Sequence, residues 1–226
     1  GLPLARYDSY EVVGRMSTAG LFYDQRKKEI RLRDLGWQLQ QAELHGLRYG
    51  GTGGADGDAA IAGAMKPYGV GTVENAEPVA INATLLLYAL SCSSIVGVDD
   101  VRDGGVPLDF DADYTSYATL AAATVPAGNY STCIAEGFIR LGSTPVYGIT
   151  VAFRGDADTI GGLGAPTTMG TIARRIATGR GSLMLSTSQL DSVSFASFES
   201  ERTAAVGFYW GALCAGRFVI DRKSVV

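Results

Sequence analysis

Histidine, cysteine, proline and lysine are all scarce in this sequence, and two of these shortages exclude whole kinds of chemistry. There are one His, three Cys, seven Pro and four Lys among 226 residues. Because His supplies much of protein acid–base catalysis and many zinc sites, a lone His45 argues against both. Cys92, Cys133 and Cys214 are far apart and form no C-x-x-C pair. We therefore expect buried, reduced thiols rather than a zinc site or a redox pair.

Long apolar runs and a strong positive charge are also missing. The longest apolar stretch, residues 83–90, is far shorter than the roughly 20 residues of a membrane-spanning helix. The first ten residues lack the basic start and apolar run of a signal peptide. The net charge is −4, so there is no basic footprint for nucleic acid. We expect a chain made in a cytoplasm, with no membrane span and no direct nucleic-acid recognition.

Glycine is abundant and the hydrophobic content is ordinary. The 30 Gly are about 13% of the chain, against an average of about 7%. Hydrophobic residues make up 46%, enough for a real core, and the glycines have no collagen period. This composition predicts a mainly β protein, built from barrel or sandwich modules with one or two short helices. We expect an N-terminal portion at 1–90, a β-rich module at 91–165, and a helix with closing strands at 166–226.

Strands are predicted where apolar residues alternate with polar ones or stand between turn residues. E-I-R-L-R-D at 29–34 has the alternation of a half-buried strand, with residues 10–13 as its expected partner. D-G-G at 103–105 is typical of a hairpin turn and predicts that residues 95–101 pair with 106–110. Further strands are expected at residues 130–134, 138–141, 146–153, 206–210 and 217–220.

One helix is well marked and two are shorter. T-M-G-T-I-A-R-R-I-A-T at 168–178 predicts a helix that Gly179 ends and whose apolar face holds Met169, Ile172, Ala173 and Ile176. Short helices are expected at 114–123 and around Phe195 and Phe198. The glycine-rich stretches at 46–71 and 155–164 are interpreted as connecting arms between modules, ordered when neighbouring subunits cover them.

No motif selects a catalytic, cofactor or metal residue. The glycines of 50–58 are not followed by the Gly-Lys-Ser/Thr of a phosphate-binding loop. Asp109, Asp111 and Asp113 alternate like the start of a calcium loop, but the required later Gly and Glu are absent, so they more simply cap and solubilise a turn. His45 has no partner motif that would make it a general base. We expect no enzyme activity and no cofactor.

A series of short strings stands out along the chain. The strings are I-R-L-R-D at 30–34, R-Y-G-G-T-G-G at 48–54, residues 82–88, D-G-G-V-P-L at 103–108, D-Y at 113–114, A-G-N-Y-S-T-C at 127–133, E-G-F-I-R-L-G at 136–142, residues 172–176, S-F at 194–195 and V-G-F-Y at 206–209. In this order they resemble a family of structural proteins of long-tailed (siphovirus-like and Mu-like) bacteriophages and prophages. The resemblance covers roughly residues 20–220, and its individual motifs are short. Members of that family look longer and continue past the part that matches residues 206–220.

The resemblance implies a structural virion protein of the tail tip or baseplate, synthesised in the bacterial host cytoplasm. It would be a hub or hub-associated ring subunit with a barrel-like portion near the tail axis, acting by assembly. Its expected partners are further copies of itself in a ring, the tail tube or distal tail protein, the tape measure and fibre proteins. Two alternatives remain open: a peripheral adaptor or receptor- or glycan-binding module, and more remotely a tail-associated cell-wall hydrolase using paired carboxylates.

Overall fold

A computed structural model describes residues 17–24, 27–33, 46–159, 164–180 and 184–211. The chain divides into two compact units, one of Gly1–Ala42 with Arg217–Val226 and one of Glu43–Gly216. His45, Cys214 and the strand predicted at 217–220 lie outside the described residues.

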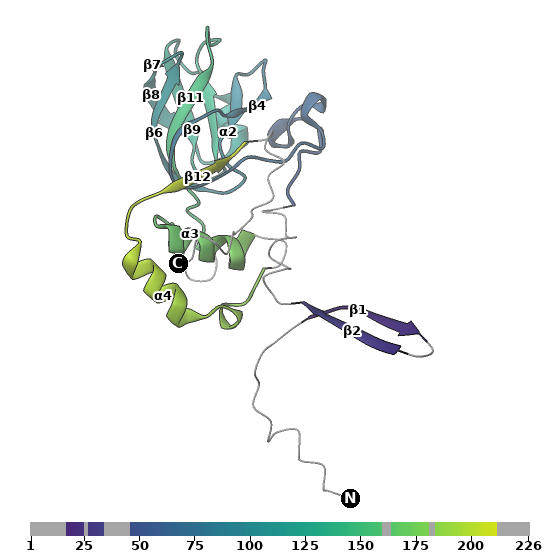
Figure 1. Ribbon diagram of the computed structural model, residues 1–226. Coiled ribbons are helices and arrows are strands. Elements are labelled where there is room, and N and C mark those ends of the chain that lie inside the picture. Colours follow the sequence, from purple (N-terminus) through teal and green to yellow (C-terminus); the bar gives the residue numbers. More distant parts are fainter. Residues whose placement is uncertain (1–16, 25–26, 34–45, 160–163, 181–183, 212–226) are drawn as a thin grey trace, which may run out of the picture. The chain divides into compact units, whose positions relative to one another are not determined.

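In the first unit the structure describes one antiparallel hairpin, formed by β1 (Ser17–Asp24) and β2 (Lys27–Arg33) (Figure 1). The strand predicted at 29–34 is confirmed by β2. In the structure β2 pairs with β1, and the register sets Leu21 opposite Ile30. Residues 10–13, which were expected to pair with it, lie outside the described residues.

The second unit is mainly β, as the composition predicts, and contains two five-stranded sheets. The first sheet has the strand order β12 (Gly207–Trp210), β3 (Tyr68–Ala76), β11 (Ile149–Gly155), β6 (Ile95–Asp103) and β7 (Val106–Pro107). The second has the order β4 (Val79–Asn82), β5 (Leu87–Ala89), β10 (Phe138–Leu141), β9 (Asn129–Cys133) and β8 (Asp109–Asp113). Strands on both sides of residue 90 pair within each sheet, so the boundary expected there falls inside this unit.

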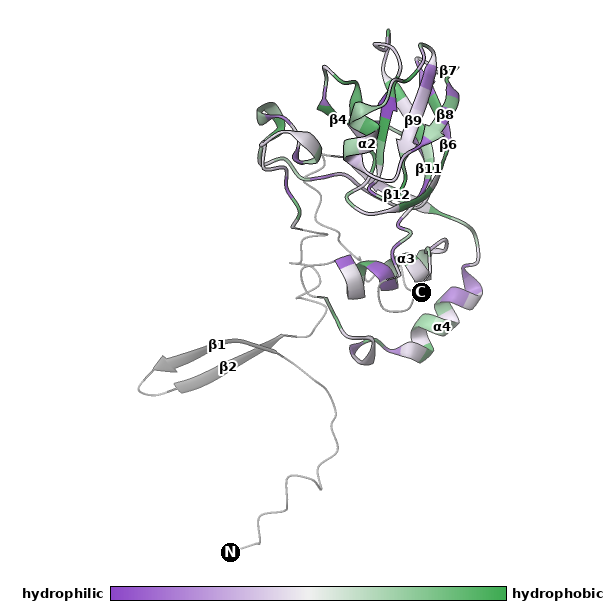
Figure 2. Cartoon of the chain, turned by 180° about the vertical axis from the view of Figure 1, so that it is seen from behind, coloured by the Kyte–Doolittle hydropathy of each residue, from purple (hydrophilic) through white to green (hydrophobic). Residues whose placement is uncertain are grey.

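The two sheets pack face to face around one apolar core, which makes this part a β-sandwich. Alternating burial along β11 sends Ile149, Val151 and Phe153 inward, as a strand with period two requires. Hydrophobic residues recur along the strands of both sheets (Figure 2). The buried core consists of Val73, Ala76, Leu90, Ile95, Val101, Tyr130, Ile139, Leu141, Ile149, Val151 and Phe153.

The other face of the second sheet is covered as well. A second core forms there between this sheet, α2 (Tyr117–Ala122) and the glycine-rich loop. Tyr49 of the loop and Leu120 of α2 are buried in it. Arg140 of β10 holds the end of α2 by donating to the carbonyls of Leu120 and Ala121. The second sheet is therefore buried on both faces, which explains the nearly continuous burial of β9 and β10.

Part of the glycine prediction is wrong. Residues 68–76 form the strand β3, although the stretch 46–71 was interpreted as a connecting arm. A Cβ added at Gly69 would lie 2.3 Å from the ring of Phe153, and one at Gly155 would lie 2.3 Å from the Gly69 carbonyl oxygen. These glycines permit close approach between β3 and β11, so they pack strands and do not connect modules.

The D-G-G hairpin is confirmed, but it is shorter than predicted. Gly104 and Gly105 have φ of +57° and +89°, which a two-residue hairpin turn of this kind needs. Of residues 106–110, only Val106–Pro107 forms a strand that pairs with β6. From Asp109 the chain crosses to the second sheet, where β8 runs parallel to β9.

Two helices lie between β11 and β12 in sequence. α3 (Met169–Arg175) continues into a π-helical turn, Ile176–Arg180, so Gly179 does not end the helix as predicted. Ile172 and Ile176 are buried as expected, whereas Met169 is exposed and Arg175 is fully buried. α4 (Ser192–Glu201) includes Phe195 and Phe198 and confirms the short helix expected there. Isolated 3₁₀ turns occupy Gly54–Asp56, Ala59–Ile61 and Thr187–Gln189.

Candidate functional site

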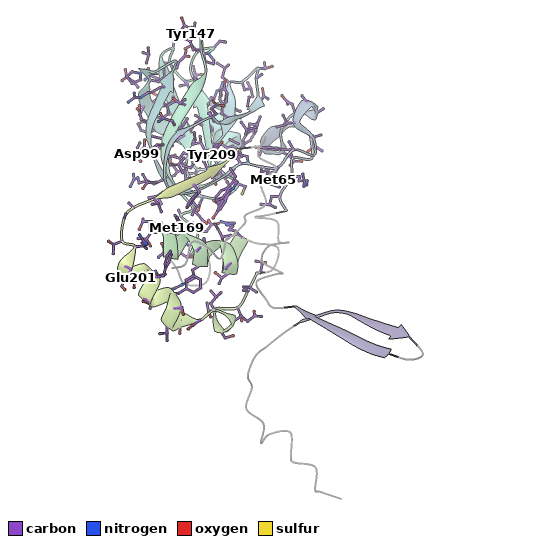
Figure 3. All side chains as sticks on the ribbon, viewed as in Figure 1. Met65, Asp99, Tyr147, Met169, Glu201 and Tyr209 are labelled. Carbon is purple, nitrogen blue, oxygen red and sulfur yellow. The ribbon has the colours of Figure 1, made fainter. Side chains whose placement is uncertain are left out.

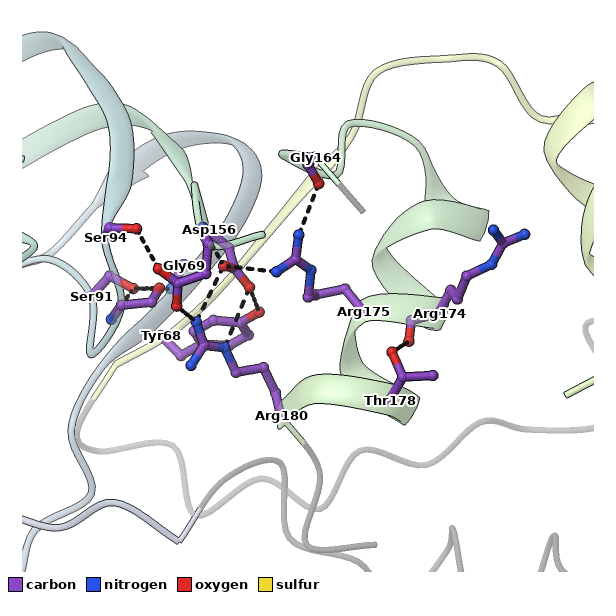
Figure 4. A network of polar contacts seen from close by, with 12 residues as sticks. Tyr68, Gly69, Ser91, Ser94, Asp156, Gly164, Arg174, Arg175, Thr178 and Arg180 are labelled. Atoms are coloured by element: carbon purple, nitrogen blue, oxygen red, sulfur yellow. Dashed lines mark hydrogen bonds and ion pairs between the residues drawn. The ribbon is translucent and has the colours of Figure 1, made fainter. Parts of the chain in front are cut away.

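A cluster of charged side chains lies where the π-helical turn and α3 meet one end of the sandwich (Figure 4). Asp156 follows β11, and Tyr68 begins β3. The close backbone approach of Gly155 and Gly69 brings these two neighbours together. Arg175 ends α3, and Arg180 ends the π-helical turn, so the cluster joins four segments.

Asp156 is the centre of the cluster and is fully buried. Its Oδ2 accepts a hydrogen bond of 2.5 Å from Tyr68 Oη. Its Oδ1 lies 3.5 Å from Arg175 Nη1 and 3.2 Å from Arg180 Nη2. Arg175 also donates to the Gly164 carbonyl at 2.8 Å. Each oxygen of the buried carboxylate is thus engaged by a charged or hydroxyl donor, as burial of a charge requires.

Asp158 extends the cluster toward the surface. Its carboxylate accepts from Ser94 Oγ and pairs with Arg180. Burial opposes ionisation of Asp158, but the hydrogen bonds from Ser94 and Arg180 outweigh it and hold its pKa below the usual range. Burial and the neighbouring Asp156 raise the pKa of Tyr68, so this phenol stays protonated and donates.

The cluster is electrically balanced, with two carboxylates against two guanidinium groups. Arg180 also lies 5.6 Å above the ring of Tyr68, and Tyr68 stacks on Trp210 of β12 at 6.1 Å. These contacts attach α3 and the π-helical turn to the ends of β3 and β11. Because the charged groups of the cluster already bind one another, the arrangement is best suited to holding α3 in place against the sandwich.

Two shallow depressions lie near polar residues. One, of about 510 Å³, is lined by Ser94, Ala157, Asp158 and Thr159. The other, of about 200 Å³, is lined by Glu74, Asn75, Asp100, Arg102, Thr150 and Ala152. Asp158 in the first already pairs with Arg180, and Arg102 in the second already pairs with Asp100.

Six aspartates lie on β6 and β8, and most of them serve the fold. Asp103 accepts from the backbone N–H groups of Val146 and Tyr147, both at 2.7 Å. Asp111 accepts from Ser131, and Asp113 accepts from Thr132. The described residues contain no group of three or more His, Cys, Asp or Glu side chains placed to hold a metal ion.

The remaining three are Asp99 and Asp100 on β6 and Asp109 at the start of β8. Asp99 pairs with Arg154 at 3.0 Å, and Asp100 pairs with Arg102. The carboxylate of Asp109 is exposed, and it engages no other side chain among the residues that the structure describes.

The glycine-rich loop at 50–58 is ordered by its own chain. Asp56 accepts from Thr52 Oγ1 at 3.1 Å and pairs with Lys66 at 3.1 Å. A hydrogen bond from the Gly50 backbone N–H lowers the pKa of Asp56 most, and a hydrogen bond from Lys66 lowers it further. This loop therefore packs on the second sheet through contacts within its own chain.

Sequence reasoning missed the Asp156 cluster altogether. Its members lie at residues 68, 94, 156–158, 175 and 180, with no motif linking them. The one available signal was Arg175, a charged residue next to the apolar positions of a strongly patterned helix.

No protein-family model, curated protein or solved structure matches this chain. None of the helices in the described ranges is long and apolar enough to cross a membrane.

Proposed function

We propose that this protein is a structural subunit of a bacteriophage tail tip or baseplate, a hub or hub-associated ring component that works by assembly. The location in a tail rests on the resemblance of the sequence strings. Support for assembly comes from one observation, the exposed apolar side chains near the β6–β7 turn and on β8.

These side chains lie around the β6–β7 turn and along β8. Val106 is 64% exposed, Val146 78% and Tyr147 71%. The Gly104 turn lies directly against the Tyr147 ring, and Tyr147 is at the tip of the sandwich in Figure 3. Phe110 on β8 is 54% exposed and packs edge-on against Tyr130. Exposed apolar patches are typical of protein–protein interaction sites.

The internal polar groups support the same proposal. The buried charges around Asp156 neutralise one another, and the aspartates of β6 and β8 mostly cap turns or bind neighbouring strands. Polar groups that are paired inside the protein in this way favour a rigid subunit that binds its partners through its surface. The proposal therefore assigns the function to the exposed apolar surface and leaves the buried cluster a structural part.

The test is to locate the chain in tails of the phage or prophage that encodes it. Mass spectrometry of purified particles and antibody labelling should find it at the distal tail end, and deletion should stop tail completion. Complete, infectious tails that lack the protein would overturn the proposal. Glycan arrays and zymography with the purified chain separate the alternatives: specific glycan binding would favour a receptor-binding module, and lysis of cell-wall material a hydrolase.

A further inference from the structure

Residues 95–113 and the β1–β2 hairpin carry net charges of opposite sign. We call residues 95–113 the acidic edge, because they hold Asp99, Asp100, Asp103, Asp109, Asp111 and Asp113 against the single Arg102. Their net charge of −5 exceeds that of the whole chain, which is −4. The rest of the chain therefore carries a small positive charge.

The acidic edge includes the terminal strands of both sheets. β7 ends the first sheet and β8 ends the second, so among the described strands each has a neighbour on one side only. Residues 106–113 are mostly exposed, and Phe110 stands between Asp109 and Asp111. An exposed edge strand offers backbone donors and acceptors to another strand, and its aspartates disfavour pairing with a copy of itself.

The hairpin of β1 and β2 has the opposite charge. Residues 17–33 carry five basic residues against Asp24 and Glu29, a net charge of +3. β2 reads K-K-E-I-R-L-R, so cations alternate with Ile30 and Leu32. In the described structure this sheet has two strands, and a two-stranded sheet is marginal in water until further strands or packing complete it.

We propose that the acidic edge of one molecule binds the β1–β2 hairpin of a second copy, with β2 added beside β8. This inference rests on the proposed assembly function and names the surfaces that carry it. The cations of β2 meet the aspartates of β8, and Ile30 and Leu32 supply apolar residues for the exposed Phe110. Strand addition of this kind takes affinity from main-chain hydrogen bonds and specificity from side chains.

The proposed contact is heterologous, because the two molecules use different surfaces. Each copy then has one hairpin and one acidic edge, so a third copy can bind in the same way. Repetition of such a contact closes into a ring or continues as a filament.

Two charge-reversed full-length variants test the proposal. The first carries Asp109→Lys with Asp111→Lys, and the second carries Lys28→Glu with Arg31→Glu. We expect the unmodified chain to assemble in sedimentation velocity runs and to dissociate as salt increases. Each variant alone should associate at least about tenfold more weakly, since like charges then face each other. Circular dichroism verifies that each variant is folded.

Mixing the variants gives the decisive result. The positive hairpin of the first variant still matches the acidic edge of the second, and the reversed pair is also complementary. We expect the mixture to recover assembly, which a contact within one molecule would not produce. A control variant with Glu77→Lys and Arg202→Glu, both exposed and outside the two surfaces, should assemble normally.

The outcomes separate this inference from the proposed function. If both variants assemble like the unmodified chain, or if the mixture stays dissociated, the hairpin–edge contact is overturned, while location in the tail can still stand. If the unmodified chain is monomeric at all concentrations, the contact is overturned as well. Absence of the chain from purified tails is the separate result that removes the proposed function.

Discussion

The Tyr68 hydroxyl donates a hydrogen bond of 2.5 Å to the buried carboxylate of Asp156, although the two residues are 88 positions apart in sequence. The bond joins the first residue of β3 to the residue after β11. It lies beneath Trp210 of β12 and beside Arg180 of the π-helical turn. The hydrogen bond therefore joins the ends of two neighbouring strands at the carboxylate that Arg175 and Arg180 also bind, which makes it a sensitive place to measure stability.

Tyr68→Phe should destabilise the second unit. The change removes a donor from a buried carboxylate, and hydrogen bonds to charged groups contribute about 1.5–3 kcal/mol. Urea unfolding should show a loss of that size in the free energy of unfolding. Tyr147→Phe, at an exposed site, is the matched control and should change it by less than about 0.5 kcal/mol. Equal losses in the two variants would contradict the role given to the Tyr68 hydroxyl.

Asp156→Asn should be more damaging. Asp156 has φ of +54°, a conformation that Asn also adopts readily, so the change removes charge with little backbone strain. Arg175 would then remain buried without its carboxylate, and breaking a buried ion pair costs about 3–5 kcal/mol. Thermal and urea unfolding measure the loss. Asp158→Asn should cost less, because that side chain is 32% exposed; the reverse order would refute this account.

Acid should destabilise the protein partly through Asp158. Its pKa is lowered in the folded state, because the hydrogen bonds from Ser94 and Arg180 outweigh the effect of burial. A carboxyl with a lower pKa in the folded than in the unfolded state stabilises the fold above about pH 4. That stabilisation is lost as the pH falls through the folded-state pKa.

We therefore expect the free energy of unfolding to fall below about pH 4 and Asp158→Asn to weaken this dependence. Urea titrations across the acid range measure both slopes. Asp56 and Asp191, whose pKa values are also lowered, should leave some dependence in the variant. Identical slopes with and without the Asp158 carboxyl would count against its contribution.

Gly69→Ala should disturb the packing between β3 and β11. The new Cβ would lie 2.3 Å from the Phe153 ring, and overpacking of a core costs about 1–3 kcal/mol. Gly148→Ala is the control, since nothing lies within 4 Å of a Cβ there, and it should be nearly neutral. The double variant with Gly69→Ala and Phe153→Leu should lose less free energy of unfolding than the two single losses added together. Additive losses would show that the two residues do not compete for space.

Cys92 should react slowly with alkylating reagents in the folded protein. Burial, the main cause, raises the pKa of its thiol to about 11, and the thiolate is the reactive form. At pH 8, mass spectrometry of iodoacetamide-treated protein should show little label on Cys92, with more as the pH approaches 11. Denatured protein is the control and should be labelled quickly. Equally rapid labelling of both forms would show that the thiol is accessible.

Much of the fold could be predicted, because period-two patterns and turn residues act locally. The strands at 138–141 and 206–210, the D-G-G turn and the short helix around Phe195 follow directly from their own residues. The β3 prediction failed for a nonlocal reason. Gly69 and Gly71 look like loop residues until the Phe153 ring and the Val206 carbonyl are seen to occupy the space of their missing side chains.

The candidate site was harder to predict than the fold. The Asp156 cluster joins residues that are adjacent only after β3, β11 and α3 have packed. Arg175 stands one position from Ile176, and a helical pattern alone places it on the edge of the apolar face. The acids at 109–113 were conspicuous in sequence, yet their bonds to β9 depend on a parallel strand pairing that no local pattern shows.

The pairing of β12 with β3 has a consequence for the order of synthesis. The register joins Gly207 to Gly71, so the edge of the first sheet is closed by a strand that leaves the ribosome well over a hundred residues after β3. Until then the nascent chain holds an apolar strand with an open side, and Tyr68 lacks the covering ring of Trp210. Completion of the sandwich is thus a late event, and the interval before it is when the growing chain most needs protection from aggregation.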